Sequence, residues 1–474
     1  MDSNEFYKLL KTSFPFKPTL KQNIGLQQLS NFIFSTIANE LFVLKGYAGT
    51  GKTTIIGVLV KSLWHANKTA VLLAPTGRAA KVISNYSKSE AFTIHKKIYV
   101  PRSEKNGKMS FVLAPNKHKK TLFIVDEASM ISDISNQAKL FGSGSLLDDL
   151  IQYVYSGPQC KLLLIGDTAQ LPPVKLDLSP ALNESNLELN YNKEVIRLEL
   201  DEVVRQGEDS GILFNATHLR EAVSNSYFDS FHFNLNGFKD IVRLNDGYEI
   251  LDAINDAYST LGSEDTALIV RSNKRANLYN EQIRSRILFN ENELTSGDFL
   301  MIVKNNYFWL KPTSEAGFIA NGDIIEVLEI FSIKELYGFR FAEVKIRMVD
   351  YPKMRPFETV LMLDTIKLET PSLPYEESNK LYQEILKDFE DESSSYKKFL
   401  GVKKSKYLNS LQVKFSYAIT CHKSQGGQWD TVFVEQPYLP NGIDRDYLRW
   451  LYTAITRAKE KLYLIGFKDD FFED

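Results

Sequence analysis

The sequence predicts an α/β fold with two parallel sheets, an inserted hairpin and an inserted β-barrel. Short apolar runs alternate with segments of helical periodicity, which is typical of parallel sheets covered on both faces by helices. These runs occupy 41–44, 70–74, 121–125 and 161–165, and later 267–270, 431–434 and 462–465. Apolar and polar side chains instead alternate along 299–303, 324–331 and 341–349, which indicates antiparallel strands.

Two insertions divide the parallel pattern. Residues 86–117 are polar and rich in turn residues, so we expect a small inserted hairpin there. Residues 298–412 hold the antiparallel pattern and a charged helical stretch, so we expect a barrel with a helical arm. The rest of the chain is predicted to form two α/β lobes, which comprise 1–85 with 118–205 and 206–297 with 413–474.

Composition excludes several classes of protein. The 474 residues are 43% hydrophobic and carry a net charge of −2, so any polyanion must be held by local patches. Two cysteines, Cys160 and Cys421, are too few for a disulfide framework or a four-cysteine zinc site. The chain has no apolar stretch of membrane-spanning length, and its first residues lack a secretory signal pattern. We expect a cytoplasmic protein with no membrane partner.

The most informative segment runs from Gly46 to Thr54 and matches G-x-x-x-x-G-K-[ST], a phosphate-binding loop. Glycines in this loop can adopt backbone angles that are closed to other residues, so successive N–H groups can point at phosphate oxygens. Lys52 supplies a positive charge for the β- and γ-phosphates, and the Thr53 hydroxyl is a Mg²⁺ ligand. The predicted nucleotide contacts are Gly46, Ala48, Gly49, Thr50, Gly51, Lys52, Thr53 and Thr54.

Acidic and amide side chains follow two other predicted strands. Asp126 and Glu127 come directly after 121–125; Asp126 is predicted to hold Mg²⁺, and Glu127 to activate the attacking water. An acidic pair at a strand end is often a helix cap, but a phosphate loop upstream favours the catalytic interpretation. Gln170 follows Gly166-Asp167 and is predicted to sense the γ-phosphate.

Two arginines lie far from the phosphate loop in sequence. Arg205 and Arg457 are candidates for stabilising the charge of a phosphoryl-transfer transition state. Taken alone, each arginine is more often part of a surface ion pair than a catalytic group. His422, at a glycine-rich loop, could contact a sugar–phosphate backbone or simply belong to a solvated turn.

In their order along the chain, these motifs resemble those of superfamily 1 group B helicases, specifically the RecD-like and Dda-like DNA helicases. The resemblance covers residues 14–466. The segments that carry it are Phe14 or Phe16 through Gln22, Gly46 to Thr54, Ala74 to Lys81, Thr93 to His95, Asp126 to Ser129, Gly166 to Gln170, Arg205, Thr420 to Gly427 and Tyr452 to Arg457.

The resemblance implies two RecA-like lobes that bind ATP and Mg²⁺ between them. It also implies that 86–117 is a 1B pin that splits the duplex and that 298–412 is an SH3-like 2B barrel. Gln22 would read the adenine, Gly427 would lie in the motif that links DNA to the nucleotide, and Arg205 and Arg457 would contact the γ-phosphate. The residues implied to contact nucleic acid are Pro75, Thr76, Arg78, His95, Thr420, His422 and Lys423.

The activity that the resemblance implies is ATP-driven movement along single-stranded DNA from 5′ to 3′, with unwinding of duplex junctions, in replication, recombination or repair. We expect a monomer of the compact Dda-like plan, with single-strand-binding or repair proteins as candidate partners. Two alternatives stay open at this point: a group B RNA helicase, and a nucleotide-gated clamp that hydrolyses ATP without travelling. Comparing how strongly single-stranded DNA and RNA of equal length stimulate the ATPase distinguishes a DNA helicase from an RNA helicase.

Overall fold

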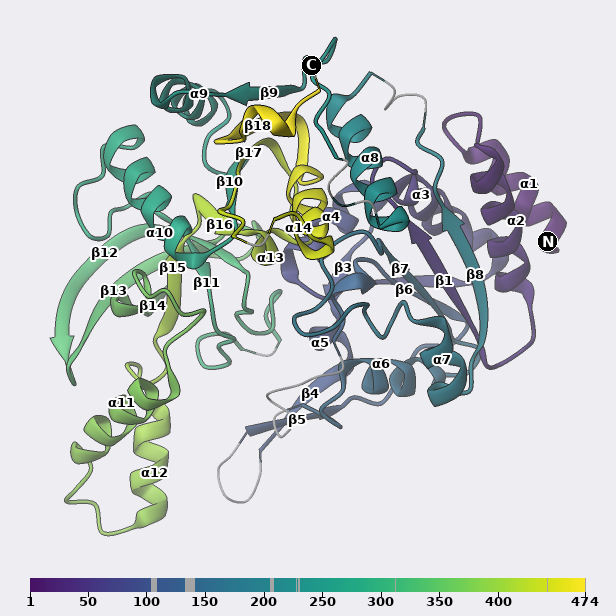
Figure 1. Ribbon diagram of the computed structural model, residues 1–474. Coiled ribbons are helices and arrows are strands. Elements are labelled where there is room, and N and C mark those ends of the chain that lie inside the picture. The colour runs from purple at the N-terminus through teal and green to yellow at the C-terminus, as the bar shows by residue number, and fades with distance from the viewer. Residues whose placement is uncertain are drawn as a thin grey trace.

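The computed structural model describes residues 1–103, 109–132, 141–204, 209–226, 228, 231–311, 313–440 and 442–473. It confirms the predicted fold class, with two parallel α/β lobes, an inserted hairpin and a closed inserted barrel (Figure 1). Within these ranges, no helix is long and apolar enough to cross a membrane.

The first lobe is built on a parallel sheet. In spatial order its strands are β3 (Ala91–Thr93), β2 (Thr69–Ala74), β6 (Thr121–Val125), β7 (Lys161–Gly166), β1 (Glu40–Gly46) and β8 (Glu194–Leu200). Its helices are α1 (Ser3–Ser13), α2 (Leu20–Phe34), α3 (Lys52–Ser62), α4 (Gly77–Ser87), α5 (Ile94–Ile98), α6 (Leu146–Tyr155) and α7 (Glu184–Tyr191). Leu41 and Val43 pack into one hydrophobic core, whereas Phe42 and Leu44 pack into another. Both faces of β1 are therefore buried, which explains its uninterrupted apolar run.

The second lobe repeats this plan with a smaller parallel sheet. Its strands, in spatial order, are β16 (Ala418–Thr420), β10 (Thr266–Val270), β17 (Trp429–Glu435), β18 (Ala458–Ile465) and β9 (Ile241–Leu244). Its helices are α8 (Gly211–Asn225), α9 (Gly247–Thr260), α10 (Asn273–Gln282), α13 (Cys421–Ser424) and α14 (Arg445–Ile455). Every residue of α14 from Tyr447 to Ile455 is buried, so this helix is a central element of the lobe.

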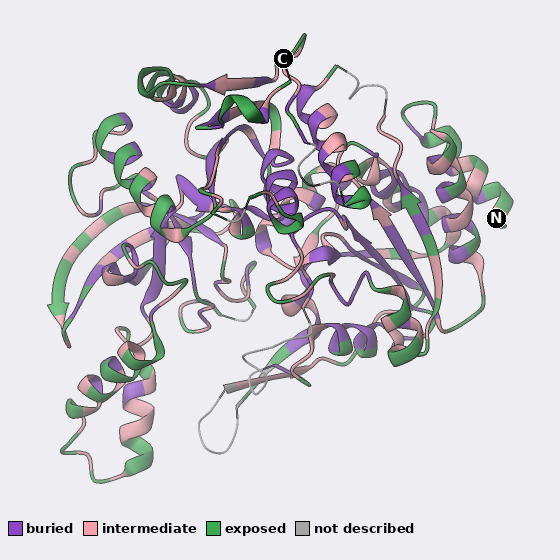
Figure 2. Ribbon diagram, in the orientation of Figure 1, coloured by how far each residue is buried: buried purple, intermediate pink, exposed green. Residues whose placement is uncertain are grey.

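The two insertions form structures of their own, separate from the parallel sheets of the lobes. The hairpin pairs β4 (Tyr99–Ser103) with β5 (Met109–Leu113), and the turn expected between them falls at 104–108, outside the described residues. The barrel consists of β11 (Phe299–Ile302), β12 (Ile324–Leu336), β13 (Phe339–Met348), β14 (Phe357–Met362) and β15 (Leu411–Phe415). Its last strand runs past the boundary expected after residue 412. Helices α11 (Tyr375–Lys387) and α12 (Ser395–Lys404) form an arm that projects from the barrel and is far more exposed than the sheets (Figure 2).

Strand order in the first sheet decides where the functional loops meet. Strands β6, β7 and β1 are direct neighbours and run parallel, so their carboxyl ends lie at one edge of the sheet. The phosphate loop follows β1, Asp126 follows β6, and Asp167 follows β7. In open α/β sheets this edge is where ligands bind.

Candidate nucleotide site between the two lobes

The phosphate loop adopts the conformation that its glycines allow. Gly49 and Gly51 have φ angles of 75° and 85°, in the left-handed region that favours glycine. Gly46 does not have a positive φ, so the expectation that its backbone angles require glycine is wrong. A Cβ at this position would lie 3.0 Å from Lys52 Cγ, so Gly46 instead leaves room for the lysine side chain. The loop leads into α3, whose N-terminal N–H groups favour an anion.

Lys52 and Gln22 both contact the phosphate loop itself. Lys52 Nζ donates hydrogen bonds to the carbonyl oxygens of Gly46 (2.6 Å) and Tyr47 (2.8 Å). Gln22 is 2% exposed; its Nε2 donates to Thr50 O at 3.0 Å, and its Oε1 accepts from Thr19 N at 3.0 Å. Gln22 therefore braces the loop from α2, a role that sequence reasoning did not assign to it.

The acidic pair is held by contacts from two directions. Asp126 Oδ1 accepts from the Glu127 N–H at 2.9 Å, and Asp126 Oδ2 accepts from the Tyr86 hydroxyl at 2.6 Å. Glu127 has a φ of 54°, which is costly for a residue with a Cβ and concentrates at functional sites. Burial raises the pKa of Glu127, which the nearby Arg457 guanidinium opposes. Tyr86, on α4, was not predicted as part of this site.

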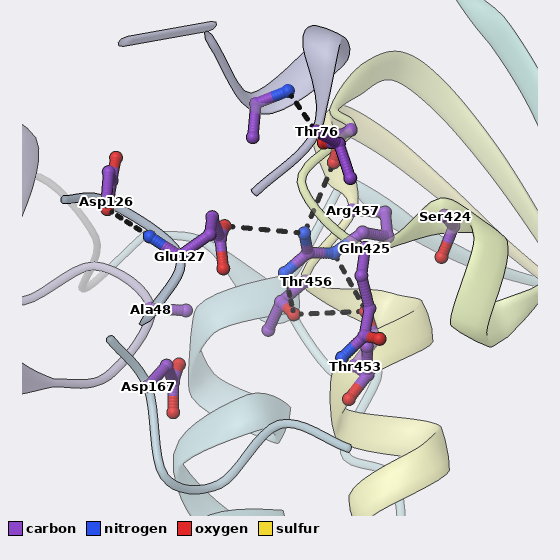
Figure 3. A network of polar contacts seen from close by, with 12 residues as sticks. Ala48, Thr76, Asp126, Glu127, Asp167, Ser424, Gln425, Thr453, Thr456 and Arg457 are labelled. Atoms are coloured by element: carbon purple, nitrogen blue, oxygen red, sulfur yellow. Dashed lines mark hydrogen bonds and ion pairs between the residues drawn. The ribbon is translucent and has the colours of Figure 1, made fainter. Parts of the chain in front are cut away.

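Arg457 reaches this acidic pair from the second lobe. Its Nη1 lies 4.0 Å from Glu127 Oε1, and the side chain is almost completely buried. Three contacts within its own lobe orient it: the guanidinium donates to Gly427 O, Thr453 O and Thr456 Oγ1. Figure 3 shows the guanidinium between these groups and Glu127. Arg457 is thus fixed within the second lobe while its guanidinium faces a carboxylate of the first lobe.

The predicted residues line one cavity of about 480 Å³ between the lobes. The members that the sequence singled out are Gln22, Ala48, Gly49, Gly51, Lys52, Thr53, Thr54, Asp126, Glu127, Gln170 and Arg457, joined by Phe14, Phe16, Gln428 and Lys459. Gly46, Thr50 and Gly427 do not line it directly. Arg205 lies outside the described residues.

The chemistry of the cavity fits a nucleotide with its metal. Gln170 is buried, and within the described part of the chain its Oε1 has no hydrogen-bond partner, as expected of a group that awaits a ligand. Because the two ends of an amide are interchangeable by a flip, this group can donate or accept. Thr53 and Asp126, which line the cavity, carry oxygen atoms of the kind that Mg²⁺ prefers and would be the residues that hold it. No cluster of three or more His, Cys, Asp or Glu side chains suited to a metal exists in the described ranges, so such a metal would rely on phosphate and water for its other ligands.

The predicted nucleic-acid residues near α4 adjoin the second lobe. Thr76 caps α4 by accepting from Ala79 N, and a Cβ on Gly426 would lie 3.2 Å from Thr76 Oγ1. The Arg78 guanidinium lies 3.9 Å from the ring centroid of Trp429, and burial lowers its pKa. Arg78 is therefore engaged by the other lobe, while Pro75 stays partly exposed.

The remaining nucleic-acid candidates are more dispersed. His95, on α5, packs against the rings of Tyr99 and Phe141, and burial lowers its pKa to about 4, so it is neutral at physiological pH. Thr420 is partly exposed and His422 is exposed at the start of α13. Burial and the nearby Lys414 lower the pKa of Lys423 to about 8. A role for these residues in DNA binding stays a prediction.

Comparisons with known proteins agree with this arrangement. Residues 31–231 match the AAA domain and residues 415–465 match the UvrD-like helicase C-terminal domain. The ATP-dependent DNA helicase Dda of Enterobacteria phage T4 is 25% identical over 475 residues, which cover 93% of this chain and 98% of Dda. The ATP-dependent RecD2 DNA helicase of Deinococcus radiodurans is 31% identical over 160 residues, 33% of this chain and 20% of its own length.

A solved structure of Pif1 helicase from Bacteroides, in complex with ADP-AlF3 and single-stranded DNA, aligns with 94% of this chain and 93% of its own at 15% identity and a TM-score of 0.46. The AAA match covers most of the first lobe and extends through α8, the UvrD-like match lies in the C-terminal part of the second lobe, and the match to Dda spans both lobes. The comparisons thus confirm the expected resemblance to superfamily 1 helicases, in the group that contains the RecD and Dda enzymes.

Proposed function

We propose that the protein is an ATP-dependent DNA helicase that moves 5′ to 3′ along single-stranded DNA and unwinds duplexes at junctions. One observation carries the proposal: the cavity takes Lys52, Asp126 and Glu127 from one lobe and Arg457 from the other, with Arg457 Nη1 4.0 Å from Glu127 Oε1. Hydrolysis then requires both lobes, so each cycle can be converted into a relative movement of the two. The similarity to the DNA helicase Dda over 93% of the chain supports DNA as the substrate.

Each residue in the cavity has a distinct part in this proposal. Lys52 and the N–H groups at the start of α3 hold the phosphates, and Gln170 contacts the γ-phosphate. Glu127 accepts a proton from the attacking water while Arg457 stabilises the charge that develops on the phosphoryl oxygens. Mg²⁺, held by Thr53 and Asp126, would neutralise phosphate charge.

Translocation also needs a grip on DNA that changes with the nucleotide. A ligand shifts a conformational equilibrium only by its different affinity for the two states. The segments around Thr76 and Gly426 meet where the lobes touch, so a strand that lies across both would respond to their relative position. We propose that Pro75, Thr76, Arg78, His95, Thr420, His422 and Lys423 contribute to this track.

Strand displacement on matched duplexes tests the proposal. One duplex carries a 5′ single-stranded tail and the other a 3′ tail of the same sequence composition, with Lys52→Ala as the control that lacks ATP turnover. We expect ATP-dependent displacement from the 5′-tailed substrate. Preference for the 3′ tail would contradict the polarity, stronger stimulation of the ATPase by RNA would favour an RNA helicase, and ATPase activity without displacement would favour the clamp.

A further inference from the structure

Helix α14 presents a stripe of side chains to the first lobe. Arg449, Tyr452 and Thr453 are spaced i, i+3 and i+4, so they share one face of the helix. All three bond to the segment that follows β7: Arg449 Nη1 donates to Asp177 O at 2.8 Å, Tyr452 donates to Asp167 Oδ2 at 2.6 Å, and Thr453 Oγ1 accepts from Leu171 N at 2.8 Å.

Tyr452 also makes a second hydrogen bond to the first lobe. Its hydroxyl oxygen accepts from the backbone N–H of Ala48, inside the phosphate loop, at 2.9 Å. The hydroxyl thus uses its acceptor on the phosphate loop and its donor on Asp167, and Asp167 Oδ1 in turn accepts from Ala169 N at 2.9 Å. Tyr452 is 1% exposed. Burial and the nearby Asp167 raise its pKa well above the ordinary value, so the hydroxyl keeps its proton and can donate.

We propose that Tyr452 is a positioning residue through which the second lobe sets the geometry of the phosphate loop and of the loop that carries Asp167 and Gln170. The inference rests on the proposed function, because it concerns ATP hydrolysis that responds to bound DNA. Tyr452 lies on α14, which ends at Ile455, and Arg457 follows two residues after that end, so a lobe movement that shifts Arg457 also shifts this hydroxyl. The contact gives DNA, bound across both lobes, a direct route to the phosphate loop.

The test compares two tyrosine-to-phenylalanine variants on one helix. Tyr452→Phe removes only the oxygen that bridges the lobes. Tyr447→Phe is the matched control, because Tyr447 is also completely buried on α14 but its hydroxyl donates to Gln436 Oε1 at 2.6 Å, inside the second lobe. Steady-state ATPase kinetics with and without a saturating single-stranded oligonucleotide give kcat, the KM for ATP and the stimulation by DNA.

For Tyr452→Phe we expect the DNA-stimulated kcat to fall tenfold or more and the stimulation ratio to fall with it, while the KM for ATP changes less than threefold. Tyr447→Phe should keep the stimulation of the unaltered protein. Unchanged stimulation in Tyr452→Phe, or an equal loss in both variants, overturns the inference. An unaltered protein whose ATPase does not respond to single-stranded DNA would instead refute the proposed function.

The partner side of the contact supplies an independent variant. Asp167→Asn keeps the shape of the side chain but removes one of the two carboxylate acceptors. If Tyr452 and Asp167 act through one hydrogen bond, the kcat of the double variant should be no lower than that of the worse single variant. Additive losses in the double variant would contradict a shared contact. If Tyr452→Phe is poorly folded, unchanged DNA stimulation in Asp167→Asn alone would overturn the inference.

Discussion

The buried carboxyl of Asp323 makes stability depend on pH. Asp323 is 1% exposed, and its Oδ2 accepts from Ala320 N at 2.7 Å. The titratable groups around it are Asp350, Tyr351 and Lys81. Lys81 Nζ forms an ion pair with Asp350 Oδ1 at 3.6 Å. Burial, and then the charge of Asp350, raise the pKa of Asp323 from 3.8 to about 8. The folded protein therefore holds a proton that the unfolded chain releases near pH 4, and the stability this proton contributes is lost as the pH rises towards 8.

We predict that Asp323→Asn stabilises the protein increasingly as the pH rises. The asparagine keeps an acceptor for Ala320 N but carries no charge, so its advantage should grow by about 1 kcal/mol per pH unit above pH 4 and level off above pH 8. Denaturant midpoints of both proteins at pH 5.5, 7 and 8.5 provide the measurement. An advantage that is the same at all three values would show that the carboxyl does not titrate in this range.

Residue-level prediction from the sequence worked where the chemistry is local. The phosphate loop and the acidic pair are short segments whose residue types are dictated by phosphate and metal, so they could be identified without a fold. Tyr86 and Tyr452 could not, because each acts on a residue that only the fold brings near: Tyr86 on Asp126, 40 positions away, and Tyr452 on Ala48, 404 positions away. A tyrosine on a buried helix otherwise has no signal that distinguishes it from core.

At the scale of elements, buried strands were predictable and an edge strand was not. The central strands β1, β6 and β7 are almost entirely buried and appear in the sequence as apolar runs. Strand β8 escaped detection because it lies at the edge of the sheet, where Glu194, Arg197 and Glu199 stay exposed and interrupt the apolar pattern. Pairing with β1, rather than its own composition, makes this segment a strand.

The hairpin β4–β5 should matter for unwinding more than for ATP hydrolysis. It lies outside both parallel sheets, and none of its described residues lines the nucleotide cavity. We predict that deletion of residues 100–110 reduces strand displacement at least several-fold more than it reduces the DNA-stimulated ATPase. Both rates are measured on the same protein preparation with the same tailed duplex. Equal losses would count against a wedge and in favour of a role in folding or DNA binding.

For the whole molecule, the two lobes meet through main-chain surfaces as well as side chains. Gly426 and Gly427 allow the second lobe to approach α4 closely, since a Cβ on Gly426 would lie 2.8 Å from Ala79 Cβ and one on Gly427 would lie 2.8 Å from Arg78 Nε. The absence of a side chain at these two glycines therefore lets the lobes pack closely. A larger residue at either position would push the lobes apart and carry Arg457, which donates to Gly427 O, with them.

Because both lobes line the site, we expect substitutions in the first lobe to impair ATP binding and substitutions in the second lobe to impair mainly ATP turnover. Lys52 belongs to the first lobe, which also supplies most of the cavity, whereas Arg457 lines the cavity from the second lobe and is its proposed catalytic group. We predict that Arg457→Ala lowers kcat for ATP about 10³-fold, the lower end of the range for arginine fingers, yet retains nucleotide binding. Lys52→Ala should lose turnover and also bind nucleotide weakly.

Thermal unfolding with a non-hydrolysable ATP analogue distinguishes these two variants, because a ligand that binds only the folded state raises the midpoint by an amount that grows with the ratio of its concentration to its dissociation constant. The shift for Arg457→Ala should remain close to that of the unaltered protein, and the shift for Lys52→Ala should be much smaller. Arg457→Lys keeps the charge but lacks the planar fork, so it should recover little of the lost rate. If Arg457→Ala turned over ATP at the normal rate, the second lobe would not take part in hydrolysis, and lobe movement would lack its link to the chemistry.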